Sequence, residues 1–108
     1  MNGVPLKNDQ MGPVDRTLDI IGERWTMLIL RELFLQGARK FQDFEQALPT
    51  ISPNTLSLRL KKLERHEMVE RRYYTDHPPR AEYLLTDKGR ALGPAFKALF
   101  KWGKKYAR

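Results

Sequence analysis

The stretch SPNTLSLRLKKLER, residues 52–65, most constrains what this chain can fold into. Ser52 can accept a hydrogen bond from the first turn of a helix, and Pro53 suits a first helical position because no N–H is needed there. Three leucines follow at i, i+4 and i+7, so they lie on one stripe that must pack inward. They are Leu56, Leu60 and Leu63. The stretch therefore predicts a helix over residues 53–66 with one buried face and one open face.

The open face of this helix mixes amide, hydroxyl, apolar and basic side chains. These are Asn54, Thr55, Ser57, Leu58, Lys61, Lys62 and Arg65. Such a mixture offers donors and acceptors for base edges and cations for phosphates, which is what a DNA major groove requires. For Lys61 and Arg65, which come late in the helix, an ordinary solvated surface is an equally good interpretation.

The segments around this helix are bounded by glycine and proline. Proline-initiated periodicity predicts a first helix over 13–21, an almost uniformly apolar segment predicts a core helix over 25–36, and a third helix of about two turns ends before Pro49. Residues 38–40 suit a short edge strand, and residues 49–51 form the tight connection of a helix-turn-helix. Thr86 can cap a last helical segment, in which Pro94 predicts either a kink or two abutting helices.

A β-hairpin is predicted between the open-faced helix and the last helical segment. MVERRYYT and AEYLLT have the β-branched and aromatic content of strands, and the two prolines of DHPPR, residues 76–80, predict a five-residue tip. The order of elements is that of a winged helix-turn-helix, mainly α with a small β-hairpin wing (α+β). With 108 residues, 41% of them hydrophobic, we expect one domain over residues 12–108 after a flexible arm over residues 1–11.

The charge is unevenly distributed along the chain. Residues 1–51 carry 6 Lys and Arg against 7 Asp and Glu, whereas residues 52–108 carry 14 against 6. The first half therefore has a net charge of −1 and the second half +8, which together give the net charge of +7. A basic half favours a polyanionic partner, either nucleic acid or an anionic membrane, over a surface kept basic for solubility alone.

Several kinds of site lack the residues they need. The sequence has no cysteine and only two histidines, so it predicts no disulfide, no metal site and no thiol nucleophile. It shows no nucleophile–base arrangement or glycine-rich phosphate loop, so we expect neither an enzyme nor a bound cofactor. No segment is apolar enough to span a membrane, and residues 1–12 lack a secretion signal. We expect a cytoplasmic, nucleoid-associated protein that does not bind membranes.

Three motifs carry a resemblance to a known family. GERWTMLILREL, ISPNTLSLRLKKLE and PPRAEYLLTDKG, within residues 12–103, resemble the bacterial HxlR-type transcriptional regulators. The resemblance implies a homodimeric DNA-binding regulator that acts near a promoter. Members often carry a cysteine just before the Pro-Val of the first helix, and some sense oxidants through it. Gly12 occupies that position here, which puts thiol-based sensing in doubt.

The predicted DNA-binding residues lie on the open helix and the wing. They are Ser52, Asn54, Thr55, Ser57, Leu58, Arg59, Lys62, His77 and Arg80. Asn54 could pair with adenine, Arg59 could reach guanine or phosphate, and Leu58 or the Thr55 methyl could contact thymine. Arg80 follows two stiffening prolines, so it could enter a minor groove or bind the backbone. His77 is more simply an exposed loop histidine.

An aromatic stripe near the C-terminus is difficult to bury in so small a domain. A two-fold seam of the first and last helices would cover it, with the interface residues Val14, Leu18, Ile21, Phe96, Leu99, Phe100 and Trp102. Such a homodimer would place two recognition helices about 34 Å apart, or a multiple of that, on an inverted repeat.

Other functions fit parts of the sequence. A winged helix can bind protein or RNA instead of duplex DNA, and Leu58 is the one apolar hint in that direction. The last helix, with its lysines and aromatics, could contact a membrane surface, although a dimer explains the aromatics better. The sequence leaves room for a small-molecule effector but marks no site for one, and it does not give the operator or the regulated genes.

Overall fold

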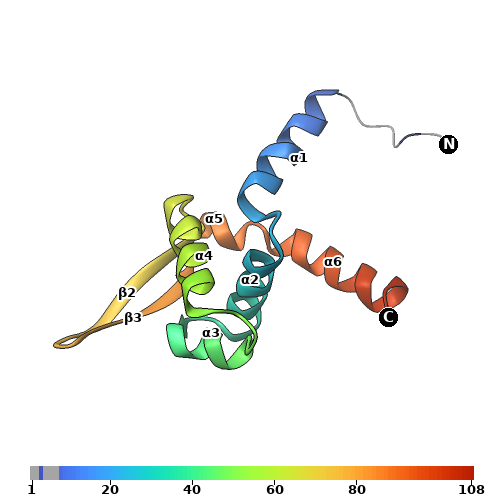
Figure 1. Ribbon diagram of the computed structural model, residues 1–108. Helices are drawn as coiled ribbons and strands as arrows, with labels where there is room; N and C mark the ends of the chain where they lie inside the picture. The colour runs from blue at the N-terminus through green and yellow to red at the C-terminus, as the bar shows by residue number, and fades with distance from the viewer. Residues whose placement is uncertain (1–2, 4–7) are drawn as a thin grey trace.

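A computed structural model describes residue 3 and residues 8–108, with side chains from residue 12 onward (Figure 1). The elements are α1 (Asn8–Ile21), α2 (Arg24–Gln36), β1 (Arg39–Lys40), α3 (Phe41–Ala47), α4 (Pro53–Arg65), β2 (Val69–Asp76), β3 (Pro79–Leu85), α5 (Asp87–Arg90) and α6 (Gly93–Tyr106). The winged helix-turn-helix order predicted from the sequence is confirmed.

The first helix is longer than predicted at its start. It begins at Asn8, so Pro13 lies inside α1 and does not open it. Of the predicted arm over residues 1–11, residues 8–11 belong to this helix, and residues 1, 2 and 4–7 lie outside the described residues. The helix ends at Ile21 as expected, and the following N–H of Gly22 donates to the carbonyl of Leu18 at 2.8 Å.

The sheet has three antiparallel strands in the order β1-β3-β2. The predicted edge strand is present, and Arg39 pairs with Tyr83 of β3. The predicted five-residue hairpin tip is wrong, because the strands continue until Asp76 pairs with Pro79 and only His77 and Pro78 form the turn. Proline lacks an N–H donor but keeps its carbonyl, and β1 does not reach this end of β3, so Pro79 leaves no partner strand unsatisfied.

The core lies where α2, α3 and α4 meet the base of the sheet. Its buried apolar members come from these elements and the turns between them: Ile29, Leu30, Leu33, Phe44, Leu48, Ile51, Leu56, Leu60, Leu63, Met68, Val69 and Leu85. The predicted leucine stripe of α4 is thus buried as a unit. The helix is fixed against the domain by that one face, and its other faces remain outside.

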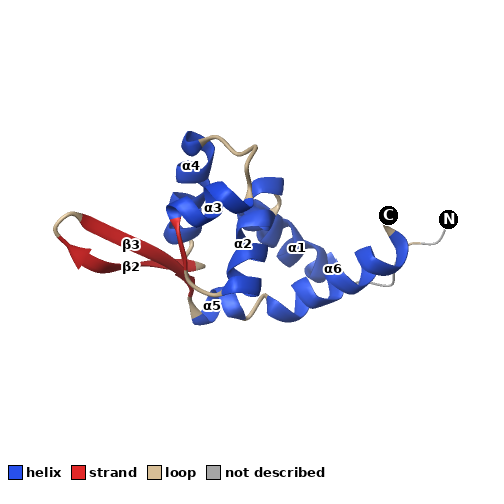
Figure 2. Ribbon diagram, turned by 90° about the horizontal axis from the view of Figure 1, so that it is seen from below, coloured by secondary structure: helices blue, strands red, loops and turns tan. Residues whose placement is uncertain are grey.

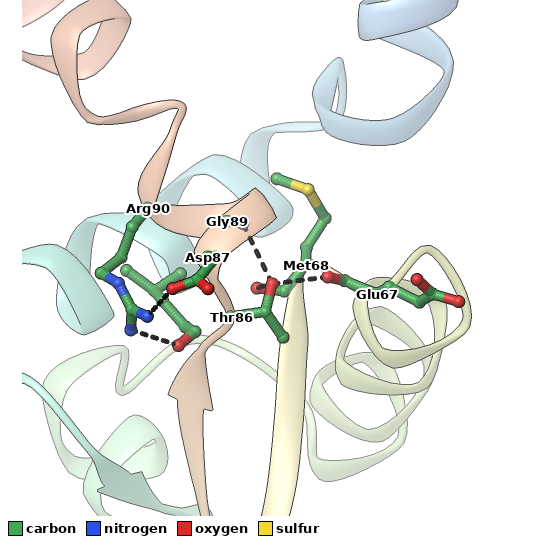
Figure 3. A network of polar contacts seen from close by, with 7 residues as sticks. Glu67, Met68, Thr86, Asp87, Gly89 and Arg90 are labelled. Carbon is green, nitrogen blue, oxygen red and sulfur yellow. Dashed lines mark hydrogen bonds and ion pairs between the residues drawn. The ribbon is translucent and has the colours of Figure 1, made fainter.

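A hydrogen-bonded junction ties the end of α4 to the base of the wing (Figure 3). Glu67 adopts a positive φ of 58° in the turn after α4, and its carbonyl accepts a 2.6 Å hydrogen bond from the Thr86 hydroxyl. The same hydroxyl accepts from the N–H of Gly89 at 3.0 Å and so caps α5, as the sequence predicted. Gly89 approaches Met68 so closely that a Cβ would lie 2.2 Å from the Met68 carbonyl oxygen.

The terminal helices leave the body on the side opposite the wing (Figures 1 and 2). The sequence predicted either a kinked helix or two abutting helices around Pro94. The structure has two helices, α5 and α6, separated by residues 91 and 92. The molecule is consequently elongated, with principal extents of 59 × 32 × 23 Å. The wing and the terminal helices occupy its two ends.

Candidate nucleic-acid interface

The start of α4 is held by its own cap. The Ser52 hydroxyl oxygen accepts a hydrogen bond from the N–H of Thr55 at 3.1 Å and donates to the Thr55 hydroxyl oxygen at 2.8 Å. Pro53 follows as the first helical residue. The first turn, which carries most of the predicted base-contacting residues, therefore has a fixed direction relative to the core.

The outer face of α4 carries the side chains that the sequence placed there. Asn54 and Leu58 are exposed, Leu58 by 56% of its surface, and Thr55, Ser57 and Lys62 are half-buried on the flanks. Lys61 and Arg65 continue the exposed face toward the end of the helix. An amide, two hydroxyls, an isobutyl group and three cations therefore lie along the outer face and flanks of α4.

Arg59 is engaged within the chain. Its Nε lies 3.1 Å from Oε2 of Glu23, the residue that caps α2 by accepting the N–H of Thr26 at 2.9 Å. Partial burial works to raise the pKa of Glu23, but hydrogen bonds from Thr26 and Trp25 and the charge of Arg59 outweigh it, so the pKa lies below its ordinary value of 4.5. Arg59 therefore links α4 to α2, which the residue type alone did not indicate.

Two arginines of the wing are also paired within the chain. Arg72 lies opposite Glu82 across the hairpin, with Nη2 to Oε1 at 2.7 Å, and Arg71 reaches back to Glu64 of α4 at 3.3 Å. Arg80 differs from both, because among the described residues no acidic side chain lies within ion-pair distance of it.

A small basic hollow lies between the start of α3 and the half of the wing nearer its tip, and the sequence analysis did not predict it. Its walls include Lys40 from the end of β1, Gln42 from α3, Tyr74 from β2 and Arg80 from β3. The Lys40 ammonium lies 5.0 Å from the centre of the Tyr74 ring. The two cations come together only because β1 pairs with β3, a contact between residues about 40 apart in sequence. A lysine at a strand–helix junction was the only signal in the sequence.

The predicted interface residues of the terminal helices fall into two groups. Val14, Leu18, Leu99 and Trp102 are exposed on α1 and α6. Ile21 and Phe96 pack against the core of their own chain, and the Phe96 ring lies 4.8 Å from that of Phe34. Phe100 is 67% exposed but lines a groove against α2.

Neither a metal site nor a membrane-spanning helix is present in the described part of the chain. No three side chains of the metal-binding types gather within it. None of its helices has the length and hydropathy that a bilayer span requires.

Comparison with known proteins agrees with this geometry. The family model described as HxlR-like helix-turn-helix matches residues 20–108. YdeP of Bacillus subtilis, named as an uncharacterised HTH-type transcriptional regulator, is 40% identical over 87% of this chain and 73% of its own length. YvaP of the same organism, named likewise, is 41% identical over 94% of both chains.

Solved structures give the same result. The reduced form of the redox regulator HypR superposes with a TM-score of 0.81 at 35% identity, covering 86% of this chain and 91% of that one. The reduced form of the transcriptional regulator YodB from B. subtilis gives 0.74 at 33% identity, covering 87% and 91%. This chain shares their winged helix-turn-helix fold but has no cysteine, and so no thiol to oxidise. It belongs to the HxlR-like helix-turn-helix family of transcriptional regulators.

Proposed function

We propose that this regulator binds double-stranded DNA sequence-specifically, as a homodimer on an inverted-repeat operator. In each half-site α4 lies in the major groove, and the wing with Arg80 lies on the adjacent minor groove or backbone. Such a protein works at the nucleoid, so the proposal includes a cytoplasmic location.

One observation carries the proposal. The leucine stripe of α4 is fully buried, so this helix cannot turn, and its remaining face presents Asn54, Thr55, Ser57 and Leu58 outward near its start. Amide and hydroxyl groups distinguish base edges by their donor and acceptor patterns, and Leu58 suits the methyl of thymine. Lys62 on the flank of the helix suits a phosphate. We assign Arg59 to positioning α4, because Glu23 already holds it.

The wing would supply contacts that do not depend on sequence. Arg80 and Lys40 line one hollow, and Arg80 has no ion-pair partner among the described residues. Two cations and a tyrosine around a hollow suit a backbone phosphate. His77, exposed at the turn, would add to this contact.

The dimer would form through the terminal helices. Val14 and Leu18 of α1 and Leu99 and Trp102 of α6 are exposed apolar side chains at the end of the molecule opposite the wing. A two-fold pairing there would cover them and leave both recognition helices free on the other side. Ile21 and Phe96 would contribute less, because each already packs within its own chain.

The second candidate function is a winged helix that binds protein. The exposed Leu58, 56% accessible in the middle of the proposed recognition face, favours it. The surrounding amide, hydroxyl and basic groups favour DNA instead, because a protein-binding helix face is usually apolar at its centre.

Selection from a random double-stranded DNA pool at physiological salt tests the proposal. We expect enrichment of an inverted repeat in which the centres of the two half-sites lie about one turn of the DNA helix apart, or a whole multiple of that distance. A single-stranded pool serves as the control and should show no enrichment. Binding that only falls as salt rises, with no enriched sequence, would contradict base recognition and favour the second candidate.

A further inference from the structure

Arg59 is the one charged residue in the first two turns of α4, the helix that the proposed function places in the major groove. It follows the exposed Leu58, so its side chain leaves the helix about 100° further around, on the flank that Thr55 shares one turn earlier. The flanks of a helix in a major groove face the phosphates that border the groove. An arginine at this position is therefore placed to bind the DNA backbone whatever the base sequence.

The structure pairs this arginine with a carboxylate of its own chain. Nε of Arg59 lies 3.1 Å from Oε2 of Glu23, and each side chain is about one-third exposed. The three cations that follow on α4 have no acidic side chain within ion-pair distance among the described residues. They are Lys61, Lys62 and Arg65. The chain therefore neutralises only the cation that lies beside its base-reading residues.

The ion pair is arranged so that its arginine can be exchanged. Nε of Arg59 is buried but makes no hydrogen bond within the described part of the chain, so the attraction is between charges without an aligned N–H···O bond. The same Glu23 oxygen accepts from the N–H of Thr26 at 2.9 Å and from its hydroxyl at 3.3 Å. Both bonds remain when Arg59 turns away. A DNA phosphate and Glu23 consequently compete for one guanidinium, and the net gain from a phosphate contact is small.

We propose that Glu23 is a specificity-determining residue, which competes with the DNA backbone for Arg59 and so keeps binding to non-operator duplex weak. Every duplex offers phosphates, so an unopposed Arg59 would strengthen binding to any sequence. Asn54, Thr55 and Leu58 gain only where the bases match. Glu23 touches neither base nor phosphate and acts through Arg59. The inference rests on the proposed function, because it requires α4 to lie in the groove.

Loss of the Glu23 charge should change operator binding and non-operator binding differently. On random duplex, the released Arg59 adds a phosphate contact. On the operator the same contact forms, but α4 also loses its link to α2, so the base-reading side chains are held less firmly and the gain is offset. The ratio of operator affinity to random-duplex affinity therefore falls.

Fluorescence anisotropy of the full chain with random duplex and with the selected operator, at several salt concentrations, tests the proposal. Glu23→Gln removes the charge, while its amide oxygen can still accept from Thr26 and cap α2. We expect this variant to bind random duplex about threefold more tightly at physiological salt. The slope of log affinity against log salt should become steeper by about 0.9. Operator affinity should rise by less than random-duplex affinity.

Two further variants separate this effect from a general gain in positive charge. Glu45→Gln removes a carboxylate of α3 that has no ion-pair partner among the described side chains, and it should raise random-duplex affinity by less than about 1.5-fold. In an Arg59→Gln background, Glu23→Gln should do no more than this control. Thermal melting verifies that each variant is folded.

Two results from this set of variants would overturn the proposal. One is random-duplex binding by Glu23→Gln that is no tighter than binding by Glu45→Gln. The other is an equal gain from Glu23→Gln with and without Arg59, because the carboxylate would then act by its charge alone. Failure of the proposed function is a separate result, seen in the parent chain as no preference for the selected operator over random duplex.

Discussion

The ion pair between Arg59 and Glu23 joins the flank of α4 to the start of α2. Each side chain is about one-third exposed, so solvent screens the pair and its contribution is small. Glu23 also caps α2, so its carboxylate has two structural tasks. We therefore expect the ion pair mainly to fix the orientation of α4 relative to α2, and to contribute little to the free energy of unfolding.

Replacing Glu23 with Gln should lower the free energy of unfolding by about 0.5–1 kcal/mol at pH 7, because the charge is lost while the amide oxygen can still accept from Thr26. The pKa of Glu23 is lowered in the folded chain, so the charged carboxylate stabilises it above pH 4.5, and this contribution disappears as the pH falls through the lowered pKa. Urea unfolding at neutral and acidic pH measures the difference. Arg59→Gln and the double variant complete a mutant cycle, and an equal deficit of Glu23→Gln at both pH values would contradict the assignment.

Gly89 is required by a close approach at the wing junction (Figure 3). A Cβ would lie 2.2 Å from the Met68 carbonyl oxygen, so either the β2 backbone or α5 would have to move. Gly89→Ala should therefore lower the free energy of unfolding by roughly 2–4 kcal/mol. Gly103→Ala is the matched control, because no atom lies within 4 Å of its Cβ position in α6, and it should be neutral or stabilise by up to about 1 kcal/mol. Equal thermal unfolding of both variants would show that the junction can relax.

At the scale of elements, local signals predicted the helices well. Gly37 follows the end of α2, Pro49 follows the end of α3, and Ser52 with Pro53 begins α4. Each of these residues acts on the backbone next to it, so its effect can be predicted from the local sequence. The hairpin tip was wrong because the cost of a proline depends on whether another strand needs its N–H, which is a property of the sheet and not of the residue. The Lys40 and Arg80 hollow was missed for the same reason, since it exists only through the β1–β3 pairing.

The two DNA-contacting elements should differ in what they contribute. Asn54→Ala should relax base preference at one position in each half-site, because the amide can make paired hydrogen bonds to one base. Arg80→Ala should weaken binding to all duplexes and reduce the salt dependence of the affinity, because a phosphate contact releases counterions whatever the sequence. Affinities for the selected operator and for random duplex at several salt concentrations distinguish these results.

Two further variants sharpen the comparison. Lys40→Gln should behave like Arg80→Ala if both cations of the hollow bind one phosphate. Lys104→Gln, a cation at the opposite end of the molecule, should change neither specificity nor salt dependence appreciably. Equal losses on operator and random duplex for both Asn54→Ala and Arg80→Ala would contradict the proposed division between base reading and backbone binding.

At the scale of the whole molecule, the two ends have different surfaces. The wing and α4 present polar and basic groups, whereas α1 and α6 present large apolar side chains that a chain of this size leaves uncovered. Sequence periodicity detected the apolar side chains of α6 but assigned Phe96, Leu99, Phe100 and Trp102 to a single interface. Assigning Phe96 and Phe100 to α2, and Leu99 and Trp102 to the outside, required the position of α2.

Trp102→Ala tests the proposed dimer. Trp102 is 61% exposed and its ring lies 5.5 Å from that of Tyr106, so the two rings form one exposed aromatic cluster on α6. Buried tryptophans commonly dominate interfaces, so the variant should weaken dimerisation by at least about tenfold.

Phe100→Ala is the matched control, because it removes a similarly exposed aromatic ring from the groove side of the same helix and should leave the dimer intact. Sedimentation velocity at micromolar concentration reports both, and a Trp102→Ala variant that remains as dimeric as the parent would place the seam elsewhere. If Phe100→Ala dissociates the dimer instead, the partner contacts the groove face, and the two apolar faces of α6 exchange the roles assigned to them here.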